Sequence, residues 1–499
     1  MNTNAEKALA VLNETCEPIC ACLNHWSYMV KDLVHTKHVH FIASQRALIA
    51  KCAGKLDTLC SVVEQFPCEC GGLRDIRDKV AALEALNETS GKEAIKLASS
   101  NAIELGHKLS ELLDTAKTCN PATPSQMSPT NYYLEGNENE ETFAFLHLTD
   151  LHLGASDSRI EWNKVAASLI SDLKRIEDRY RINWNAIFFT GDIAFSDAKE
   201  QYENFDTVLS DLYSRWTSSG SSPEFLAIPG NHDLTQIEYN DSDAQFSHLT
   251  KFHQQPAIGK QVLDAKNPLH EYVTKPFDEY KNWWETLSYK PEDITGGKMP
   301  GDFSHIFKLG TKRVGVVGLN STFMNIWSSK SYSLFPPKGN QAVLSQQLDS
   351  VCGGNVSQWC AANDINILLT HHPANWMNAK SKFDEILNPN NFNLHFCGHQ
   401  HEPQSTVASK NSATPTRSCL GRSLFGREWK SATCDFERIH GFSYYILKIG
   451  ENETRVRHWP RQTNKNFHHQ LIPDYWHFKL CQESDDHGTA EEIIKKHQQ

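Results

Sequence analysis

Residues 143–154 read Phe-Ala-Phe-Leu-His-Leu-Thr-Asp-Leu-His-Leu-Gly, an apolar run that ends in an aspartate and a histidine. Short apolar runs rich in Ile, Val and Phe are typical of buried β-strands. Five more runs of this kind follow along the chain, each succeeded by polar residues: 186–190, 225–229, 314–319, 365–370 and 394–397. Open α/β sheets carry their chemistry just beyond the carboxyl ends of such strands. The runs therefore predict a sheet with one functional edge.

Most of the polar residues at these strand ends are of metal-binding types. The candidate ligands are Asp150, His152, Asp192, Asn231, His371, His399 and His401. Nitrogen and oxygen donors without a thiolate suit two divalent ions better than one structural zinc. Two ions about 3.5–4 Å apart can bind a phosphoryl group and activate a bridging water. His232 is the candidate proton donor to the leaving oxygen, with Asp233 as the residue that orients its ring.

The composition is that of a folded protein of two or three domains. The chain has 499 residues, of which 39% are hydrophobic and 22% charged, and a formal net charge of −11. A net negative charge does not favour binding of the whole surface to nucleic acid or an anionic membrane. A local basic groove remains an alternative. The chain has no apolar run long enough to span a membrane and no export signal at its N-terminus, so we expect a cytoplasmic protein. The fourteen cysteines are then expected to be thiols or metal ligands rather than disulfides.

Four segments of different pattern divide the chain. Residues 1–118 predict an all-α helical bundle for oligomerisation or partner docking, because apolar residues recur there at helical spacing. Residues 119–142 contain three prolines among small and polar residues, which is typical of a linker. Residues 143–470 predict an α/β domain, in which strands alternate with amphipathic helices. Residues 471–499 are expected to form a C-terminal tail.

Within the α/β domain, amphipathic helices are predicted at 161–181 and 200–216. Two β-strands, at 441–449 and 454–459, are expected to close the domain. Residues 234–305 interrupt the alternation and are dense in aromatic residues. Because this insertion follows one of the strand ends, it is interpreted either as a lid over the site or as a helical decoration with its own small core.

Five motifs follow one another in the α/β domain: Asp150-x-His152, Gly191-Asp192, Gly230-Asn-His-Asp233, His371-His-Pro373 and Gly398-His-Gln-His401. In this order they resemble the calcineurin-like metallophosphoesterase superfamily, over residues 143 to about 460. The wording of the first three motifs is similar to the bacterial phosphodiesterase branch and to domains fused to signalling or defence modules. The resemblance implies a four-layer αββα sandwich of two sheets flanked by helices.

The resemblance also implies roles for single residues. One metal would take Asp150, His152, Asp192 and His401. The other would share Asp192 and take Asn231, His371 and His399. His232 matches the catalytic histidine of the family. His371 is preferred to His372 as a ligand because the family's ligand commonly stands two residues before the proline, which leaves His372 for substrate contact or a supporting role. Mn, Fe, Zn and Ni all remain open as the metals, with Mn slightly favoured.

These observations predict a binuclear metal-dependent phosphohydrolase, specifically a phosphodiesterase that acts on nucleotides or nucleic acid. A metal-bridged hydroxide would attack phosphorus, and His232 would protonate the leaving alkoxide. One alternative is a DNA or RNA nuclease of the same superfamily, which the negative net charge disfavours. The other is a non-catalytic regulatory subunit that senses a nucleotide.

Several other residues have simpler interpretations. The buried strands at 143–149 and 394–397 carry two histidines that we expect to be core residues, His147 and His395. Three arginines after the last motif are expected in a surface loop, although a contact with phosphate is the alternative: Arg417, Arg422 and Arg427. Five N-terminal cysteines lack the spacing of a zinc knuckle and are expected to be buried thiols: Cys16, Cys20, Cys22, Cys68 and Cys70.

Overall fold

The structure is a computed structural model that describes residues 140–155, 158–216, 222–238, 243–328, 337–388, 390–400, 403–408, 416–430, 435–463, 471–475, 477–481 and 487–495. The chain forms two compact units, and the larger one comprises residues 131–428 and 437–499. Of the other unit, the described residues belong to two short paired strands, β11 (Arg427–Lys430) and β12 (Asp435–Arg438). The predicted bundle, its cysteines, and all but the last three residues of the predicted linker lie outside the described residues.

The first sheet of the larger unit has the strand order β15-β14-β13-β1-β2-β3, and β16 pairs with β14. Three parallel strands lead into the motifs: β1 (Glu141–Leu148), β2 (Ala186–Phe189) and β3 (Glu224–Ala227). The rest of the sheet comes from the end of the chain: β13 (Gly441–Ile449), β14 (Glu453–Thr463), β15 (Leu471–Pro473) and β16 (Glu492–Lys495). Strand β13 runs antiparallel to β1, with Phe143 opposite Leu447.

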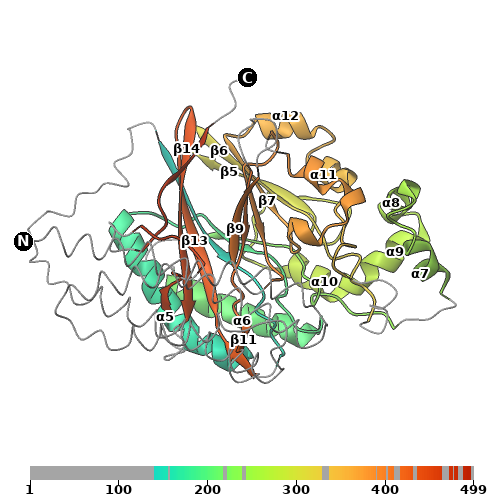
Figure 1. The fold of residues 1–499 in the computed structure, drawn as a ribbon, viewed down its shortest axis with the longest axis horizontal. Coiled ribbons are helices and arrows are strands. Elements are labelled where there is room, and N and C mark those ends of the chain that lie inside the picture. The colour runs from blue at the N-terminus through green and yellow to red at the C-terminus, as the bar shows by residue number, and fades with distance from the viewer. Residues whose placement is uncertain are drawn as a thin grey trace, which may run out of the picture. The chain divides into compact units, whose positions relative to one another are not determined.

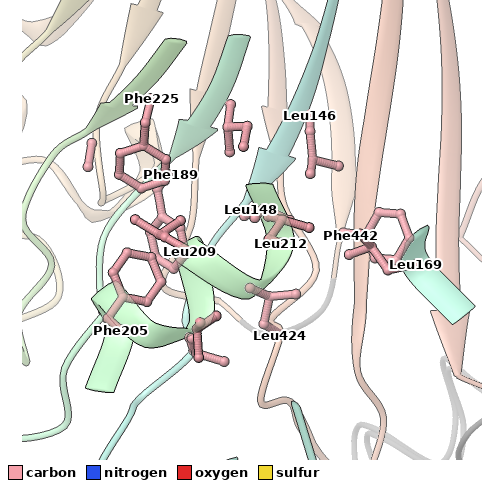
Figure 2. Packing of buried hydrophobic residues seen from close by; sticks show 14 of the residues in the cluster. Leu146, Leu148, Leu169, Phe189, Phe205, Leu209, Leu212, Phe225, Leu424 and Phe442 are labelled. Atoms are coloured by element: carbon pink, nitrogen blue, oxygen red, sulfur yellow. The ribbon is translucent and has the colours of Figure 1, made fainter. Parts of the chain in front are cut away.

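Alternation along β1 explains why this strand is apolar throughout. Phe143 and Phe145 point to one face of the sheet, and Leu146 and Leu148 point to the other, as expected from the period of two in a strand. The second face packs against α5 (Ser158–Tyr180) and α6 (Lys199–Trp216). Figure 2 shows Phe205, Leu209 and Leu212 of α6 packed against Leu148 and Phe189. Both faces of the strand are therefore buried.

The second sheet has the order β4-β5-β6-β7-β8-β10-β9. Its strands are β4 (Thr295–Gly296), β5 (Phe303–Leu309), β6 (Lys312–Gly318), β7 (Ile365–Leu369), β8 (Leu394–Cys397), β9 (Gln404–Ala408) and β10 (Thr416–Leu420). Four strands of this sheet run parallel to one another: β6, β7, β8 and β10. The carboxyl ends of β6, β7 and β8 therefore lie at one edge of the sheet.

One hydrophobic core lies between the two sheets, and two others lie between the sheets and the outer layers of helices (Figure 1). Phe143, Phe188 and Leu226 of the first sheet pack against Val316 and Ile367 of the second. The outer face of the second sheet is covered by three helices, α11 (Ser345–Val351), α12 (Val356–Ala361) and α13 (Phe383–Ile386). The layers run helix, sheet, sheet, helix, which confirms the predicted four-layer sandwich.

The aromatic insertion folds into short helices that share a core with the segment after β6. They are α7 (Ala244–Leu249), α8 (Pro256–Val262), α9 (Pro268–Thr274) and α10 (Asp278–Thr286), with the 3₁₀ turn η2 (Lys275–Phe277) before the last. This core includes Phe246, Phe252 and Phe277 together with Phe323 and Trp327. α10 is tied to the main domain, because Tyr280 donates a hydrogen bond to the Ala227 carbonyl at 3.0 Å. The insertion is helical, its core is shared with residues outside it, and its role as a lid stays a prediction.

Some predicted boundaries need correction. The predicted insertion, 234–305, runs into β5, which begins at Phe303. The predicted C-terminal tail, 471–499, contributes β15 and β16 to the first sheet, so the sheet continues past residue 470. β9 and β10 were not predicted, because their sequences are short and mixed in polarity.

A buried ion pair ties the C-terminal segment to the loop that follows β10. Arg422 and Asp474 are 2% and 1% exposed, and the Arg422 Nη2 lies 3.0 Å from the Asp474 Oδ2. The same loop holds the first motif, since Ser423 Oγ and the Phe425 amide both donate to the Asp150 carbonyl, at 2.8 and 3.0 Å. Arg422 is thus a structural residue and does not lie in an exposed loop as predicted.

Asp474→Asn is expected to lower the free energy of unfolding by about 3–5 kcal/mol, because it removes the carboxylate charge that compensates the buried Arg422 guanidinium. Burial raises the pKa of Asp474, but His477 and Arg422 outweigh it and hold the pKa below its ordinary value. The stabilisation is therefore present above that ordinary pKa and is lost as the pH falls through the lowered one. Chemical denaturation at pH 7 measures the effect. The exposed pair Asp278–Lys281 is the control, where Asp278→Asn should change stability by less than about 1 kcal/mol.

Candidate metal centre

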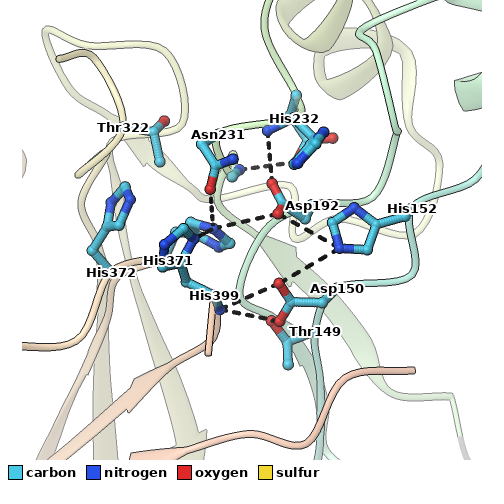
Figure 3. Close-up of polar contacts among 12 residues, drawn as sticks. Thr149, Asp150, His152, Asp192, Asn231, His232, Thr322, His371, His372 and His399 are labelled. Carbon is cyan, nitrogen blue, oxygen red and sulfur yellow. Dashed lines mark hydrogen bonds and ion pairs between the residues drawn. The ribbon is translucent and has the colours of Figure 1, made fainter. Parts of the chain in front are cut away.

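Ligand-type residues from both sheets meet at one edge of the sandwich, just past the strand ends (Figure 3). Six of the seven predicted ligands are brought together there: Asp150, His152, Asp192, Asn231, His371 and His399. The first four follow β1, β2 and β3, and the two histidines follow β7 and β8. The seventh predicted ligand, His401, lies outside the described residues.

One group of donors surrounds the His152 ring. Its Nε2 lies 4.0 Å from the Asp150 Oδ1 and 3.8 Å from the Asp192 Oδ2. Asp150 is fully buried and Asp192 is 2% exposed, so two carboxylates stand close together away from water. Such an arrangement is costly unless a cation compensates the charges.

A second group surrounds the His371 ring. Its Nε2 lies 3.0 Å from the Asn231 Oδ1, 3.2 Å from the His399 Nδ1 and 3.6 Å from the Asp192 Oδ2. Asp192 therefore belongs to both groups, and its carboxylate lies between the imidazoles of His152 and His371. This is the position that a carboxylate shared by two ions would need.

The protonation of His371 indicates that a cation fits this site. The His371 Nδ1 lies 2.8 Å from the Thr190 carbonyl oxygen, which can only accept a hydrogen bond, so Nδ1 carries a proton. Burial lowers the pKa of His371 although Asp150 is near, so the ring is neutral and Nε2 has a free lone pair. That lone pair faces the Asn231 oxygen. Imidazole, carboxylate and amide donors that converge in this way suit a first-row divalent metal.

The loops that carry the ligands have an unusual backbone conformation. Asp150, His152, Asp192 and His399 all have positive φ, at 54°, 50°, 57° and 72°, a region that costs non-glycine residues about 1–3 kcal/mol each. Main-chain hydrogen bonds between loops hold two of them, since the amides of Asp150 and His152 donate to the carbonyls of Gly191 and Asp192 at 3.0 and 2.9 Å. The His399 amide donates to the Asp150 carboxylate, at 3.2 and 3.1 Å to its two oxygens. The second sheet therefore helps to position a ligand of the first.

Gly230→Ala is expected to displace Asp192 and to reduce turnover by about 10²-fold, the effect of a misplacement near 1 Å in an active site. A Cβ at Gly230 would overlap the backbone nitrogen and the carboxylate of Asp192. Metal content and phosphoesterase activity of the purified variant measure the effect. Gly296→Ala is the matched control, because nothing lies within 4 Å of a Cβ at Gly296. Normal metal content in Gly230→Ala would contradict the prediction.

His232 lies beside the first group, with its ring held by the backbone of the neighbouring loop. Its Nδ1 lies 2.8 Å from the Phe195 carbonyl oxygen, to which it donates, and its amide donates to the Asp192 Oδ1 at 2.8 Å. Burial alone lowers the pKa of His232, but the Asp192 charge and the Phe195 carbonyl outweigh it and raise the pKa above its ordinary value. A ring with Nδ1 fixed in this way presents Nε2 for proton transfer.

Asp233 has a different position from the one predicted. Its carboxylate accepts the amides of Ile193, Ala194 and Gly230 at 3.1, 2.8 and 2.9 Å, and the Phe195 carbonyl, not Asp233, orients the His232 ring. Burial raises the pKa of Asp233. Asp233 therefore joins the loops after β2 and β3, a backbone role that the motif alone could not reveal.

His372 lies next to the second group and is fully buried. Its Nδ1 lies 3.0 Å from the Ser321 carbonyl oxygen, and burial lowers its pKa far below the ordinary value. The ring is thus neutral, and its Nε2 has no hydrogen-bond partner among the residues that the structure describes. Ser321 follows β6, one of the six predicted strands, but its contact with His372 was not foreseen. The ring of Trp376 stacks on His372 with centroids 5.8 Å apart.

Other residues considered from the sequence have structural roles. His147 and His395 are fully enclosed and contact Thr190 and Thr370, at 2.9 and 2.8 Å, and burial lowers the pKa of each to about 3. They are core histidines, as predicted. Arg417 pairs with Glu492 of β16, and the side chain of Arg427 lies outside the described residues. Four of the cysteines that the structure describes are buried free thiols: Cys352, Cys360, Cys397 and Cys419.

The comparison with protein families agrees with this architecture. The family of calcineurin-like phosphoesterases matches residues 143–403, just over half of the chain. No curated protein matches the chain. A crystal structure of Chaetomium thermophilum Vps29 is similar at 8% identity with a TM-score of 0.25, over 71% of this chain and 97% of that one, a likeness too small to support a conclusion.

A sandwich with converging imidazoles and carboxylates past its strand ends defines a metal-dependent phosphoesterase, a hydrolase. The chain belongs to the calcineurin-like phosphoesterase family. In the described part of the chain, no helix has both the length and the apolar character needed to cross a membrane.

Proposed function

We propose that the protein is a phosphodiesterase that acts on nucleotides or nucleic acid, with two divalent metal ions. The observation that carries the proposal is the position of Asp192 between the two donor groups, with His232 beside them. Asp150, His152 and Asp192 would hold one ion, and Asp192, Asn231, His371 and His399 the other. His401 stays a proposed ligand of the first ion on the sequence motif alone. Bound divalent ions would supply an activated water and neutralise charge on the phosphoryl oxygens.

The chain's own groups then perform the remaining steps. His232 donates a proton from Nε2 to the leaving oxygen, while Nδ1 stays bound to the Phe195 carbonyl. His372 stays a proposed substrate contact on the sequence motif alone, because its ring is fully buried. Asp233 joins the loops after β2 and β3, which keeps Asp192 and His232 in fixed positions relative to each other.

A diester is favoured over a monoester by the charges around the site. A monoester carries close to two negative charges at neutral pH, and enzymes often bind such groups with arginine. The two arginines that follow the last motif and whose side chains are described, Arg417 and Arg422, are held in ion pairs with Glu492 and Asp474. A diester has one negative charge and needs less compensation beyond the metals.

Hydrolysis of bis-p-nitrophenyl phosphate and of p-nitrophenyl phosphate, in Mn, Ni or Zn, tests the proposal. Diester turnover that is lost in Asp192→Ala would support it. Turnover of the monoester alone would replace it by a phosphatase. Bound metal without any turnover would favour the regulatory, nucleotide-sensing alternative. Mn as the preferred metal and a cytoplasmic location are proposals from the sequence, and the same metal series tests the first.

A further inference from the structure

Phe195 is an exposed aromatic side chain inside the candidate site. It is 45% exposed, and among the described residues the other exposed large hydrophobic side chains are Ile160, Tyr475 and Ile493. Its ring stacks on the His232 ring, with centroids 5.3 Å apart and planes at 20°, and meets the His152 ring edge-on at 6.4 Å. An apolar ring left open to solvent beside catalytic groups is a candidate binding surface.

Hydrogen bonds fix the backbone that carries the Phe195 ring. The Phe195 amide donates to the Leu153 carbonyl at 2.9 Å and to the Gln201 Oε1 at 2.8 Å. The Ser196 amide also donates to the Gln201 Oε1, and the Gln201 side-chain amide donates to the Ser196 hydroxyl, at 3.0 and 2.8 Å. Because the Phe195 carbonyl in turn accepts from His232, the ring and the proton donor are positioned together.

The position of the ring relative to His232 decides which part of a substrate it can meet. In the proposed reaction His232 protonates the leaving oxygen, so a group attached to that oxygen lies on the side of the site where Phe195 stands. A neutral aromatic face binds planar, weakly polar groups by stacking, and nucleobases bind aromatic side chains in this way with little regard to sequence. A sugar without a base has no planar π-surface to stack on the ring.

We infer that Phe195 is a specificity-determining residue that stacks on a nucleobase of the leaving group. The protein would thus prefer phosphodiesters in which the departing alcohol is a nucleoside. The inference rests on the proposed phosphodiesterase function, because it uses His232 as the group that protonates the leaving oxygen.

The test compares two diesters that differ only in the base: uridine 5′-methylphosphate and the 5′-methylphosphate of 1-O-methylribose. The rates of release of uridine and of 1-O-methylribose are measured with the wild-type protein, Phe195→Leu and Phe195→Trp. The wild type should release the nucleoside with a kcat/KM about tenfold higher, within the range that one stacked base contributes. Phe195→Leu should bring the two values to within about twofold, chiefly through a higher KM for the uridine compound, and Phe195→Trp should restore the preference.

Metal content and circular dichroism show that each variant is folded, and the exposed position makes Phe195→Leu a mild change. If Phe195→Leu slows both diesters equally, the ring only supports His232 and the inference is overturned. A base preference that is absent in the wild type or unchanged in Phe195→Leu overturns it as well. Bis-p-nitrophenyl phosphate distinguishes failure of the proposed function from failure of the inference. If the wild type does not hydrolyse it, both the proposed function and the inference are overturned. If the wild type hydrolyses it, either of the results above overturns only the role of Phe195.

Discussion

Asp192→Ala is expected to lose both bound metal ions and to lower kcat/KM by more than about 10⁴-fold, beyond the 10²–10⁴-fold that a single acid–base group contributes. The reason is the position of its carboxylate, 3.8 Å from the His152 Nε2 and 3.6 Å from the His371 Nε2. Each donor group loses its shared charge when the carboxylate is removed. The His232 amide also loses its acceptor at 2.8 Å.

Metal content of the purified variant by elemental analysis and diester turnover are the measurements. Asp192→Asn is the informative partner, because an amide oxygen can still accept from the His232 amide while the charge is gone. We expect Asp192→Asn to bind little metal and to keep its fold. Asp278→Asn, at the exposed pair with Lys281, is the control and should retain both ions. Two ions per chain in Asp192→Ala would refute the shared-ligand assignment.

His232→Asn is expected to keep its metal and to lose about 10²–10⁴-fold in kcat, the contribution of a general acid. The loss should depend on the leaving group. An alkoxide needs a proton as it departs, whereas p-nitrophenolate is stable as an anion. Dialkyl phosphodiesters should therefore show the full loss and bis-p-nitrophenyl phosphate a loss of less than about tenfold.

The dependence of the loss on the leaving group distinguishes a proton donor from a residue that only positions Asp192. A variant that merely disturbed Asp192 would slow good and poor leaving groups alike and would bind less metal. His253→Asn provides a control, since His253 is a histidine of the insertion that contacts the Asn340 carbonyl at 2.8 Å. Equal losses on the two substrates would count against His232 as the acid.

The features of this protein that could be predicted from its sequence are those that a local pattern of residues encodes. The six apolar strands could be located because both faces of β1 and its neighbours are buried, which leaves short but uninterrupted apolar runs. The ligand-type residues could be located because the ends of parallel strands gather at one edge. The helices α5 and α6 showed their apolar faces in the same way.

The rest depends on contacts between segments that are distant in sequence. The Phe195 carbonyl that accepts from His232 is a backbone group, so its contact cannot be predicted from the type of residue. Asp233 contacts three amides of two loops, whereas its place next to His232 in the motif suggested a contact with the ring. Arg422 looked like a surface residue because its partner, Asp474, is 52 positions away. β9 has too few apolar residues to be distinguished from a loop, and β15 has only three residues.

The pairing of β1 with β13 has a consequence for the time course of synthesis. Strand β1 lies between β2 and β13, and Phe143 is opposite Leu447. A ribosome that adds 5–20 residues per second needs roughly 15–60 s to make the intervening chain of about 300 residues. Throughout that interval one edge of the apolar strand β1 is unpaired, and unpaired strand edges can pair with other chains. The nascent protein therefore depends on protection from aggregation until its last strands have emerged.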